Sequence, residues 1–217
     1  MPKIVRVNPE KPDPKTINLV AKIINEGGVI IYPTDTVYGI GTSALNPQGI
    51  LKIFKIKKRP LNEALPIAVS GIDMADELAF IPEKARELIG RFWPGALTII
   101  LRKKPIVPFE ATGGRNYVGL RAPNHAVPIA IIKKSGLPLI ATSANKHDGA
   151  SPVTAGEALR QVGENVDLCL DAGRTEIQRP STVLDLTKSP PVVLRIGSIS
   201  VVAIKKILGE VGVQSIS

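Results

Sequence analysis

Lys57 and Arg59 are the residues that most directly suggest chemistry. They belong to the cationic segment 55–59, at the end of a helix predicted to begin at Asn46. Pro60 ends that helix, so we expect Lys57 and Arg59 to project from the loop that follows. Arg suits bidentate recognition of a phosphate, and Lys suits a point-charge contact. Cations at a helix C-terminus also offset the helix dipole, which is a purely structural explanation of the same residues.

Two threonines follow the first long apolar run of the chain. Residues 29–32 are continuously apolar, which is typical of a buried strand, and Thr34 and Thr36 come after them. Alternate residues of an extended chain face the same way, so the two hydroxyls share a face. They can hold a polar ligand or satisfy backbone groups at a turn, and the sequence supports both readings equally.

Other polar residues follow apolar strands in the same way. Arg121 comes after a strand predicted at 117–120, where a long cation can clamp a carboxylate or phosphate; a surface arginine is the alternative. The strand predicted at 139–141 ends in Ser143 and Asn145, where small side chains expose backbone N–H groups to an anion.

Strand ends are the places where open α/β sheets bind their ligands. Ser181 and Arg195 lie at the edges of two later strands, predicted at 181–186 and 192–196. The sequence therefore predicts a basic groove that binds a phosphate-bearing small molecule through Lys57, Arg59, Arg121 and Ser143.

Strand and helix patterns alternate along the whole chain. Helices are predicted to begin at Asp13, Asn46 and Thr154, and to span 82–92, 128–134 and 201–208. Further strands are predicted at 65–70, 97–101 and 167–170. We therefore predict a single α/β domain over residues 1–217, with its core at about 13–208 and a large, twisted mixed β-sheet flanked by helices. The residues after Leu208 are expected to form a frayed tail.

Composition bounds the class of protein. Hydrophobic residues make up 44% of the 217 residues, and 28 Lys and Arg against 19 Asp and Glu give a net charge of +9. Such a charge suits a nucleotide, RNA or a phosphorylated metabolite. The single cysteine, Cys169, is expected at a buried strand position. No signal peptide and no apolar run of membrane-spanning length are recognised, so a cytoplasmic protein is expected.

Several known sites are excluded. Residues 39–44 match G-x-G-x-x-A, but Asn46-Pro47 follows where a dinucleotide-binding helix would have to begin. No P-loop motif and no nucleophile elbow are present. His125 and His147 have no metal-ligand partners at useful spacing, so no protein metal site is expected.

Six segments occur in the order and approximate spacing of the YrdC/Sua5 family, which the chain resembles from about residue 16 to residue 197. They are PTDTVYG (33–39), KKRP (57–60), WPG (93–95), VGLRAP (118–123), TSAN (142–145) and STV (181–183). The resemblance implies a YrdC/RibB-like fold. It also implies the short form, without the additional C-terminal domain of the Sua5 type.

Members of this family are threonylcarbamoyl-AMP synthases, so the resemblance implies a nucleotidyltransferase. L-threonine, bicarbonate and ATP would give L-threonylcarbamoyladenylate and pyrophosphate. A downstream tRNA-modifying transferase complex would then transfer the threonylcarbamoyl group to N6 of adenosine 37 in tRNA, the t6A modification. The resemblance further implies Mg²⁺ with the nucleotide. A weak direct contact with tRNA is left open by the sequence, and no membrane partner is expected.

The family motifs also imply roles for individual residues. The threonine contacts would be Thr36, Arg121 and Ser181, with Arg121 paired to the threonine carboxylate. The ATP contacts would be Lys57, Arg59, Ser143, Asn145, Ser151 and Arg195. Lys57 and Arg59 would be catalytic, because they would neutralise charge that develops on the phosphates.

Two positions depart from the family pattern. Ala68 stands where longer members often carry a histidine, and Glu63 stands where an amide or Lys is common. These departures support one alternative, a family paralogue with another substrate. The charge of +9 supports a second, an RNA-binding module, although 4% aromatic residues offer few platforms for base stacking.

Overall fold

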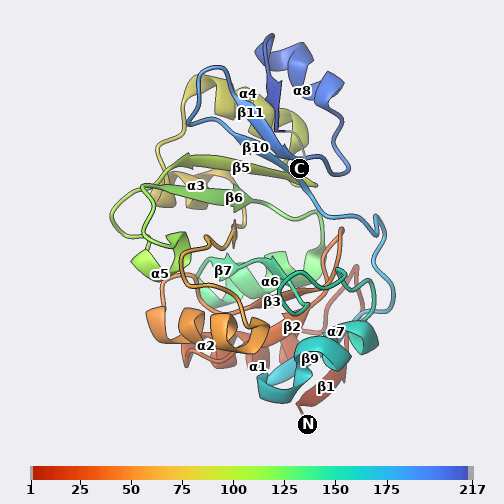
Figure 1. Cartoon of the computed structure of the whole chain (residues 1–217). Coiled ribbons are helices and arrows are strands. Elements are labelled where there is room, and N and C mark those ends of the chain that lie inside the picture. The colour runs from red at the N-terminus through yellow and green to blue at the C-terminus, as the bar shows by residue number, and fades with distance from the viewer. Residues whose placement is uncertain (1, 215–217) are drawn as a thin grey trace.

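Two mixed β-sheets organise the computed structural model, which describes residues 2–214 (Figure 1). The five-stranded sheet has the order β1 (Lys3–Arg6), β9 (Leu168–Asp171), β2 (Ile30–Tyr32), β3 (Gly39–Gly41) and β8 (Thr142–Ser143). The seven-stranded sheet has the order β12 (Gly212–Val213), β11 (Val192–Arg195), β10 (Thr182–Asp185), β5 (Leu97–Arg102), β6 (Tyr117–Arg121), β4 (Ile67–Ala68) and β7 (Leu139–Ile140). A β-bridge between Ser43 and Leu139 joins the two sheets.

Helices cover both faces of the five-stranded sheet. Side chains of α1 (Pro14–Asn25) and α6 (Ala126–Ser135) pack with Ile30 and Tyr32 on one face. Those of α2 (Pro47–Lys57) and α7 (Ala155–Val162) pack with Ile31 on the other. This alternation follows from the two-residue side-chain period of β2, and it explains why the whole strand is apolar.

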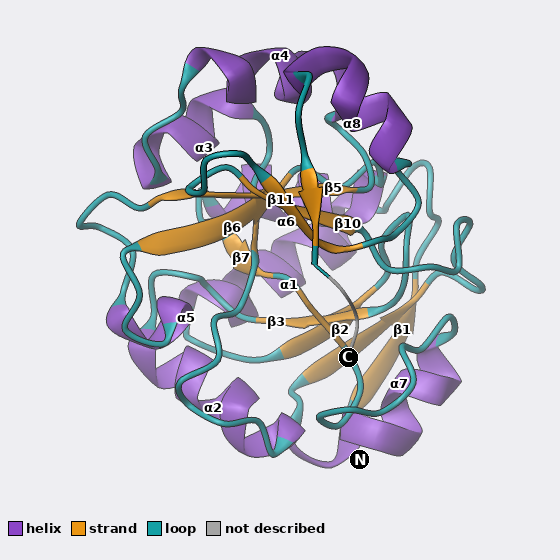
Figure 2. Ribbon diagram, turned by 45° about the horizontal axis from the view of Figure 1, so that its top comes forward, coloured by secondary structure: helices purple, strands orange, loops and turns teal. Residues whose placement is uncertain are grey.

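The seven-stranded sheet has its helices gathered on one side. These are α3 (Ile72–Leu78), α4 (Glu83–Phe92) and α8 (Val201–Leu208), as Figure 2 shows. Two short elements complete the fold, α5 (Phe109–Thr112) and the 3₁₀ helix η1 (Gly163–Asn165). None of the helices described is long and apolar enough to cross a membrane.

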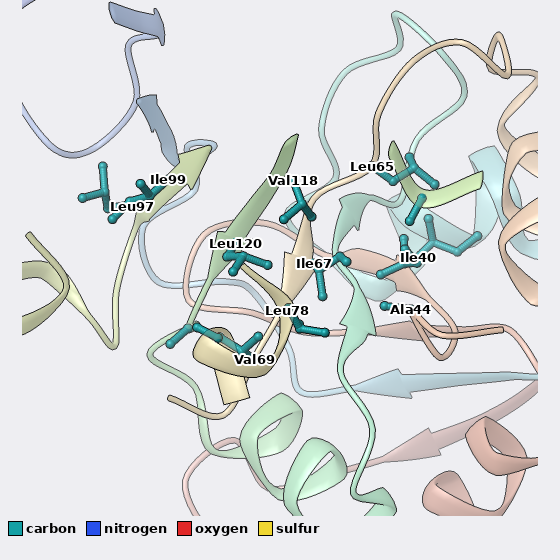
Figure 3. Packing of buried hydrophobic residues seen from close by; sticks show 14 of the residues in the cluster. Ile40, Ala44, Leu65, Ile67, Val69, Leu78, Leu97, Ile99, Val118 and Leu120 are labelled. Atoms are coloured by element: carbon teal, nitrogen blue, oxygen red, sulfur yellow. The ribbon is translucent and has the colours of Figure 1, made fainter. Parts of the chain in front are cut away.

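One hydrophobic cluster reaches from one sheet to the other. Figure 3 shows Ile40 of the five-stranded sheet in the same packed group as Ile67, Leu97 and Leu120 of the seven-stranded sheet. All four are fully buried, and burying a side chain of this size stabilises a fold by about 1.5–3 kcal/mol. The shared core fixes the position of the two sheets, and therefore of the strand ends that face each other between them.

The predicted helix starts are confirmed because capping is local. Asp13 accepts a hydrogen bond from the Thr16 amide at 2.9 Å, and Asn46 accepts one from the Gly49 amide at 3.0 Å. Each cap is followed by a proline at the first helical position, where a missing N–H has no cost.

The α/β class with mixed sheets flanked by helices is confirmed, with two corrections of detail. The strands divide into two sheets instead of one large sheet. The residues after Leu208 are not a frayed tail up to Gln214, because β12 pairs in parallel with β11 and Val211 is buried. Gly39–Gly41 is strand β3, which agrees with the rejection of a dinucleotide-binding helix there.

Candidate active site

Arg121 lies at the end of β6 and uses three donors within the protein. Its Nε donates to the carbonyl of Gly95 at 2.8 Å, its Nη1 to the Thr36 hydroxyl at 2.8 Å, and its Nη2 to Asp35 Oδ1 at 2.5 Å. Only 9% of the residue is exposed. Burial lowers the pKa of Arg121, and Asp35 opposes that shift. A guanidinium has five N–H donors, so two remain for a ligand.

The turn after β2 confirms one of the two readings that the sequence left open, the satisfaction of backbone groups by Thr34. Thr34 Oγ1 accepts from the amides of Thr36 and Val37 at 3.1 and 3.3 Å and donates to the Val37 carbonyl at 2.7 Å, as a turn-stabilising hydroxyl does. Thr36 instead points its hydroxyl at Arg121. The two hydroxyl oxygens are 3.0 Å apart, so they share a face as predicted.

Ser181 and Arg195 form a second pair at this end of the seven-stranded sheet. The Ser181 hydroxyl lies 2.8 Å from that of Thr98 and accepts from Arg195 Nη2 at 3.1 Å. Arg195 Nε also donates to the Ser181 carbonyl at 3.0 Å, and the charge of Arg121 helps to lower the Arg195 pKa after the larger effect of burial. The structure thus places Arg195, a predicted ATP contact, directly beside Ser181, a predicted threonine contact.

A small pocket connects the Arg121 corner with the strand that carries Ser143. Its lining includes Thr34, Thr36, Ala68, Arg121 and Ser143. Ala68 pairs with Arg121 across β4 and β6, and both residues line this pocket. We call this pocket, with Ser181, the Arg121 end of the groove.

Lys57 is the last residue of α2 and is buried, with 1% of it exposed. This corrects the expectation that it projects from a loop. Its Nζ donates to the carbonyls of Ser143 and Asn145, each at 2.5 Å, because the segment after β8 passes over the end of α2. Burial, and then the charge of Arg59, lowers the pKa of Lys57 to about 7.

Arg59 does follow the helix, after Lys58 in a left-handed conformation, and its side chain is 21% exposed. Its Nη2 lies 2.9 Å from Glu63 Oε2 and donates to the Ala64 carbonyl at 3.2 Å. Its Nε is buried and has no hydrogen-bond partner within residues 2–214. Arg59 therefore keeps donor capacity that the described part of the protein does not use.

Asn145 and Ser151 lie in the segment that leads from β8 to α7. The Asn145 amide nitrogen donates to the carbonyls of Lys146 and Gly149 at 2.7 and 2.8 Å. Its Oδ1 is buried without a partner among the described residues. Ser151 is half-buried nearby in the sequence. We call Lys57, Arg59, Ser143 and Asn145 the Lys57 end of the groove.

The described residues contain no group of three or more His, Cys, Asp or Glu side chains arranged to hold a metal ion. The carboxylate at the Lys57 end, Glu63, is already bound to Arg59 and to His147. These side chains do not fit a protein-held Mg²⁺.

The sequence predictions missed three residues that shape the site. Asp35 stands between the two threonines that were singled out, and its charge is the counter-ion of Arg121. His147 follows Asn145 by two positions, and its Nε2 lies 3.3 Å from Glu63 Oε1. Thr98 carried no signal, since a hydroxyl inside an apolar strand is common.

Comparison with known proteins assigns the family. The sequence profile of the Sua5/YciO/YrdC family, described as "Telomere recombination", matches residues 22–197. The threonylcarbamoyl-AMP synthase of Pyrococcus abyssi is 38% identical over 91% of this chain and 58% of its own length. That of Bacillus subtilis is 37% identical over 93% of this chain and 59% of its own length. The chain thus spans less than two thirds of these two relatives.

Other relatives match over almost their full length. A putative threonylcarbamoyl-AMP synthase of Methanocaldococcus jannaschii is 34% identical over 92% of this chain and 93% of its own. Among solved structures, P. abyssi Sua5 complexed with L-threonine superposes with a TM-score of 0.94 at 37% identity, over 97% of this chain and 62% of that one. Escherichia coli YciO superposes with a TM-score of 0.86 at 27% identity, over 94% of this chain and all of that one. On these matches, which run through every strand end described above, the chain belongs to the Sua5/YciO/YrdC family.

Proposed function

We propose that this protein is a nucleotidyltransferase that forms L-threonylcarbamoyladenylate and pyrophosphate from L-threonine, bicarbonate and ATP. The observation that carries the proposal is that Ser143 joins two unlike cationic clusters: it lines the pocket at Arg121, and its carbonyl accepts from Lys57. Arg121 offers two free donors beside hydroxyls, which suits a small hydroxy amino acid with a carboxylate. Lys57 and Arg59 offer cationic donors without full compensation, which suits a polyphosphate. A solved relative, P. abyssi Sua5, was complexed with L-threonine, which supports threonine as a ligand of this protein.

The reaction needs little covalent work from the protein. The threonine ammonium group first loses a proton. The resulting neutral amine attacks the carbon of bicarbonate, and loss of water leaves a carbamate. A carbamate oxygen then attacks the α-phosphorus of ATP, and the bond to the β-phosphate oxygen breaks to release pyrophosphate. The protein contributes by holding the two reactants together and by stabilising charge on the leaving phosphates.

Residue roles follow from the two ends of the groove. Thr36, Arg121 and Ser181 hold threonine, and Arg121 binds its carboxylate with the two donors that Asp35, Thr36 and Gly95 leave free. Lys57, Arg59, Ser143, Asn145 and Ser151 hold the nucleotide. Arg195 contacts Ser181, so we place it where the two substrates meet.

Mg²⁺, if it accompanies ATP, is ligated by phosphate oxygens, because the described side chains do not supply a carboxylate set for it. We assign no step of the reaction to a protein-bound metal. The product is an activated acyl-adenylate, so a downstream transferase acting on tRNA is the expected consumer.

A paralogue with a different substrate is the second candidate, and Ala68 favours it. A methyl group lines the pocket that Arg121 also lines, at a position where longer family members often carry a histidine. A panel of L-threonine, L-serine and other small amino acids, each tested in the same assay, separates the two candidates.

The deciding assay measures pyrophosphate released from ATP by the purified protein. We expect release that requires both threonine and bicarbonate, with omission of either as the control. If ATP stays intact under these conditions and the protein binds tRNA tightly, the enzyme hypothesis fails and the protein is an RNA-binding module.

A further inference from the structure

Glu63 occupies the one place in the described groove where a carboxylate touches a proposed nucleotide-binding cation. Its Oε2 lies 2.9 Å from Arg59 Nη2, and 35% of its side chain is exposed. Arg59 is also tied to the Ala64 carbonyl in the same loop. In the unliganded protein, Arg59 is therefore turned toward its own loop.

A triphosphate and Glu63 compete for the same guanidinium. Both present anionic oxygens, and a phosphate that takes over Arg59 would lie within a few ångströms of the carboxylate. Like charges at that separation repel, and the partly buried site screens them less than bulk water does. A phosphate can bind the free Nε of Arg59, and its charge then weakens the contact between Glu63 and Nη2.

His147 offers Glu63 a second position. Its Nε2 lies 3.3 Å from Glu63 Oε1, so the carboxylate bridges Arg59 on one side and the imidazole on the other. The His147 amide donates to the Lys57 carbonyl at 2.8 Å, which fixes the backbone of this histidine against the end of α2. A Glu63 carboxylate that loses Arg59 therefore still has the imidazole of His147 beside it.

We propose that Glu63 is a positioning residue that sets the affinity for ATP: it lies on both Arg59 and His147 before the nucleotide arrives, and it keeps only the contact with His147 when the nucleotide binds. This inference rests on the proposed function, because it assumes that the Lys57 end of the groove receives a triphosphate. It assigns a use to a residue that departs from the family pattern and to a histidine that the sequence left without a role.

Removing the charge of Glu63 and removing the imidazole of His147 should change the affinity for ATP in opposite directions. Glu63→Gln removes the competing charge and keeps the side-chain shape, so ATP should bind roughly three- to tenfold more tightly. His147→Ala removes the alternative partner and leaves Glu63 on Arg59, so ATP should bind about two- to fivefold more weakly. In the double variant the histidine effect should disappear, since no carboxylate remains to be moved.

Titration calorimetry of the full chain with ATP measures these affinities without requiring turnover. Glu63→Asp keeps the charge and serves as the matched control, which should not tighten binding. Glu87→Gln removes an exposed carboxylate from α4 and controls for a general change in charge; it should shift the affinity less than twofold. In steady-state assays, Glu63→Gln should lower the KM for ATP and leave the KM for threonine unchanged.

The outcomes separate the two proposals. If the wild type binds ATP and Glu63→Gln binds it equally or more weakly, the role of Glu63 is refuted while the proposed function stands. Additive effects in the double variant would refute the role of the contact with His147. If the wild type binds no ATP at millimolar concentration, the proposed function itself fails, and this inference fails with it.

Discussion

The cationic side chains at the two ends of the predicted groove have different interaction partners. At one end, Arg121 is buried against the carboxylate of Asp35 and is held by three hydrogen bonds in a single orientation. At the other, Lys57 is equally buried, but its ammonium group meets two backbone carbonyls, and none of the ion pairs found within residues 2–214 includes it. Arg59 meets a carboxylate that is itself shared with His147.

This difference indicates what each end can do before a ligand arrives. At the Arg121 end, the guanidinium has a counter-ion and three fixed hydrogen bonds, so it can select a ligand by shape and by two remaining donors. At the Lys57 end, an amine is buried without a matching negative charge, and this burial lowers its pKa to about 7, so a bound anion favours its charged form. A bound anion should therefore gain more binding free energy at the Lys57 end. Discrimination between ligands by their shape should be stronger at the Arg121 end.

The largest expected effect tests the balance at the Arg121 end. Asp35→Ala leaves a buried guanidinium without its counter-ion, and breaking such a pair costs about 3–5 kcal/mol of unfolding free energy. Denaturant-induced unfolding measures this loss. Asp35→Asn, which keeps a hydrogen-bond acceptor, should cost less. A loss under about 1 kcal/mol for the alanine variant would show that Arg121 is not as desolvated as the structure indicates.

Arg59→Ala tests the Lys57 end by turnover. Removing one donor that stabilises developing charge should slow threonine-dependent pyrophosphate release about 10²- to 10³-fold. The thermal midpoint should change little, because the only ion pair lost is a partly exposed one. Arg59→Lys should recover part of the rate at most, since an ammonium group lacks the planar fork. Turnover that survives in the alanine variant would remove Arg59 from the nucleotide site.

Lys57 predicts a proton linkage that the Arg121 end should lack. Its pKa is about 7 in the folded protein against an ordinary value of 10.5, so at pH 8 the unliganded side chain is mostly neutral. Triphosphate oxygens favour the ammonium form, so ATP binding at pH 8 should take up about one proton. Calorimetry in two buffers with different ionisation heats measures this uptake. Lys57→Met should abolish it, and threonine binding should show none.

The same shift fixes the sign of a stability effect. Between about pH 7 and pH 10.5 the unfolded chain binds the Lys57 proton and the folded chain does not. The contribution of Lys57 to the unfolding free energy therefore rises with pH across that window. In Lys57→Met this part of the pH dependence should be missing, and an unchanged pH profile would contradict the burial of a neutral amine.

The smallest expected effect concerns Ser181. Ser181→Ala removes the hydroxyl that Thr98 and Arg195 share, at a cost of about 1 kcal/mol. The KM for threonine should rise several-fold while ATP affinity stays unchanged. Thr98→Ser, which keeps a hydroxyl, is the matched control. If the KM values for threonine and for ATP rise equally, Ser181 lies where the two substrates meet and not at the threonine position.

Local patterns account for the parts of the fold that the sequence predicted well. Asp13, Asn46 and Thr154 cap helices because a cap depends on residues two or three positions away. The division into two sheets was not predictable in the same way, because strand pairing is decided by residues far apart in the sequence. The tail after Leu208 was misjudged because a two-residue strand has no periodicity to detect.

The site shows the same limit. Lys57, Arg59, Arg121 and Ser143 stood out by residue type and by position after an apolar element, and Lys57 and Ser143 do meet. The burial of Lys57 was not predictable, since it depends on a segment 86 residues further along the chain. The contact between Glu63 and His147 is equally non-local, and no spacing rule connects the two residues.

Cys169 makes local opening of the five-stranded sheet measurable by thiol labelling. It is the only cysteine, it is fully buried in β9, and it is paired with Ile4 and Ile31 on either side. Burial raises the pKa of its thiol to about 12, so a thiol reagent reacts only when β9 separates from its neighbours. The rate of thiol labelling therefore measures how often the five-stranded sheet opens. Strand β2 of this sheet leads into Thr34 and Thr36. Slower labelling with threonine present would report, without any enzymatic assay, that the ligand holds this sheet closed.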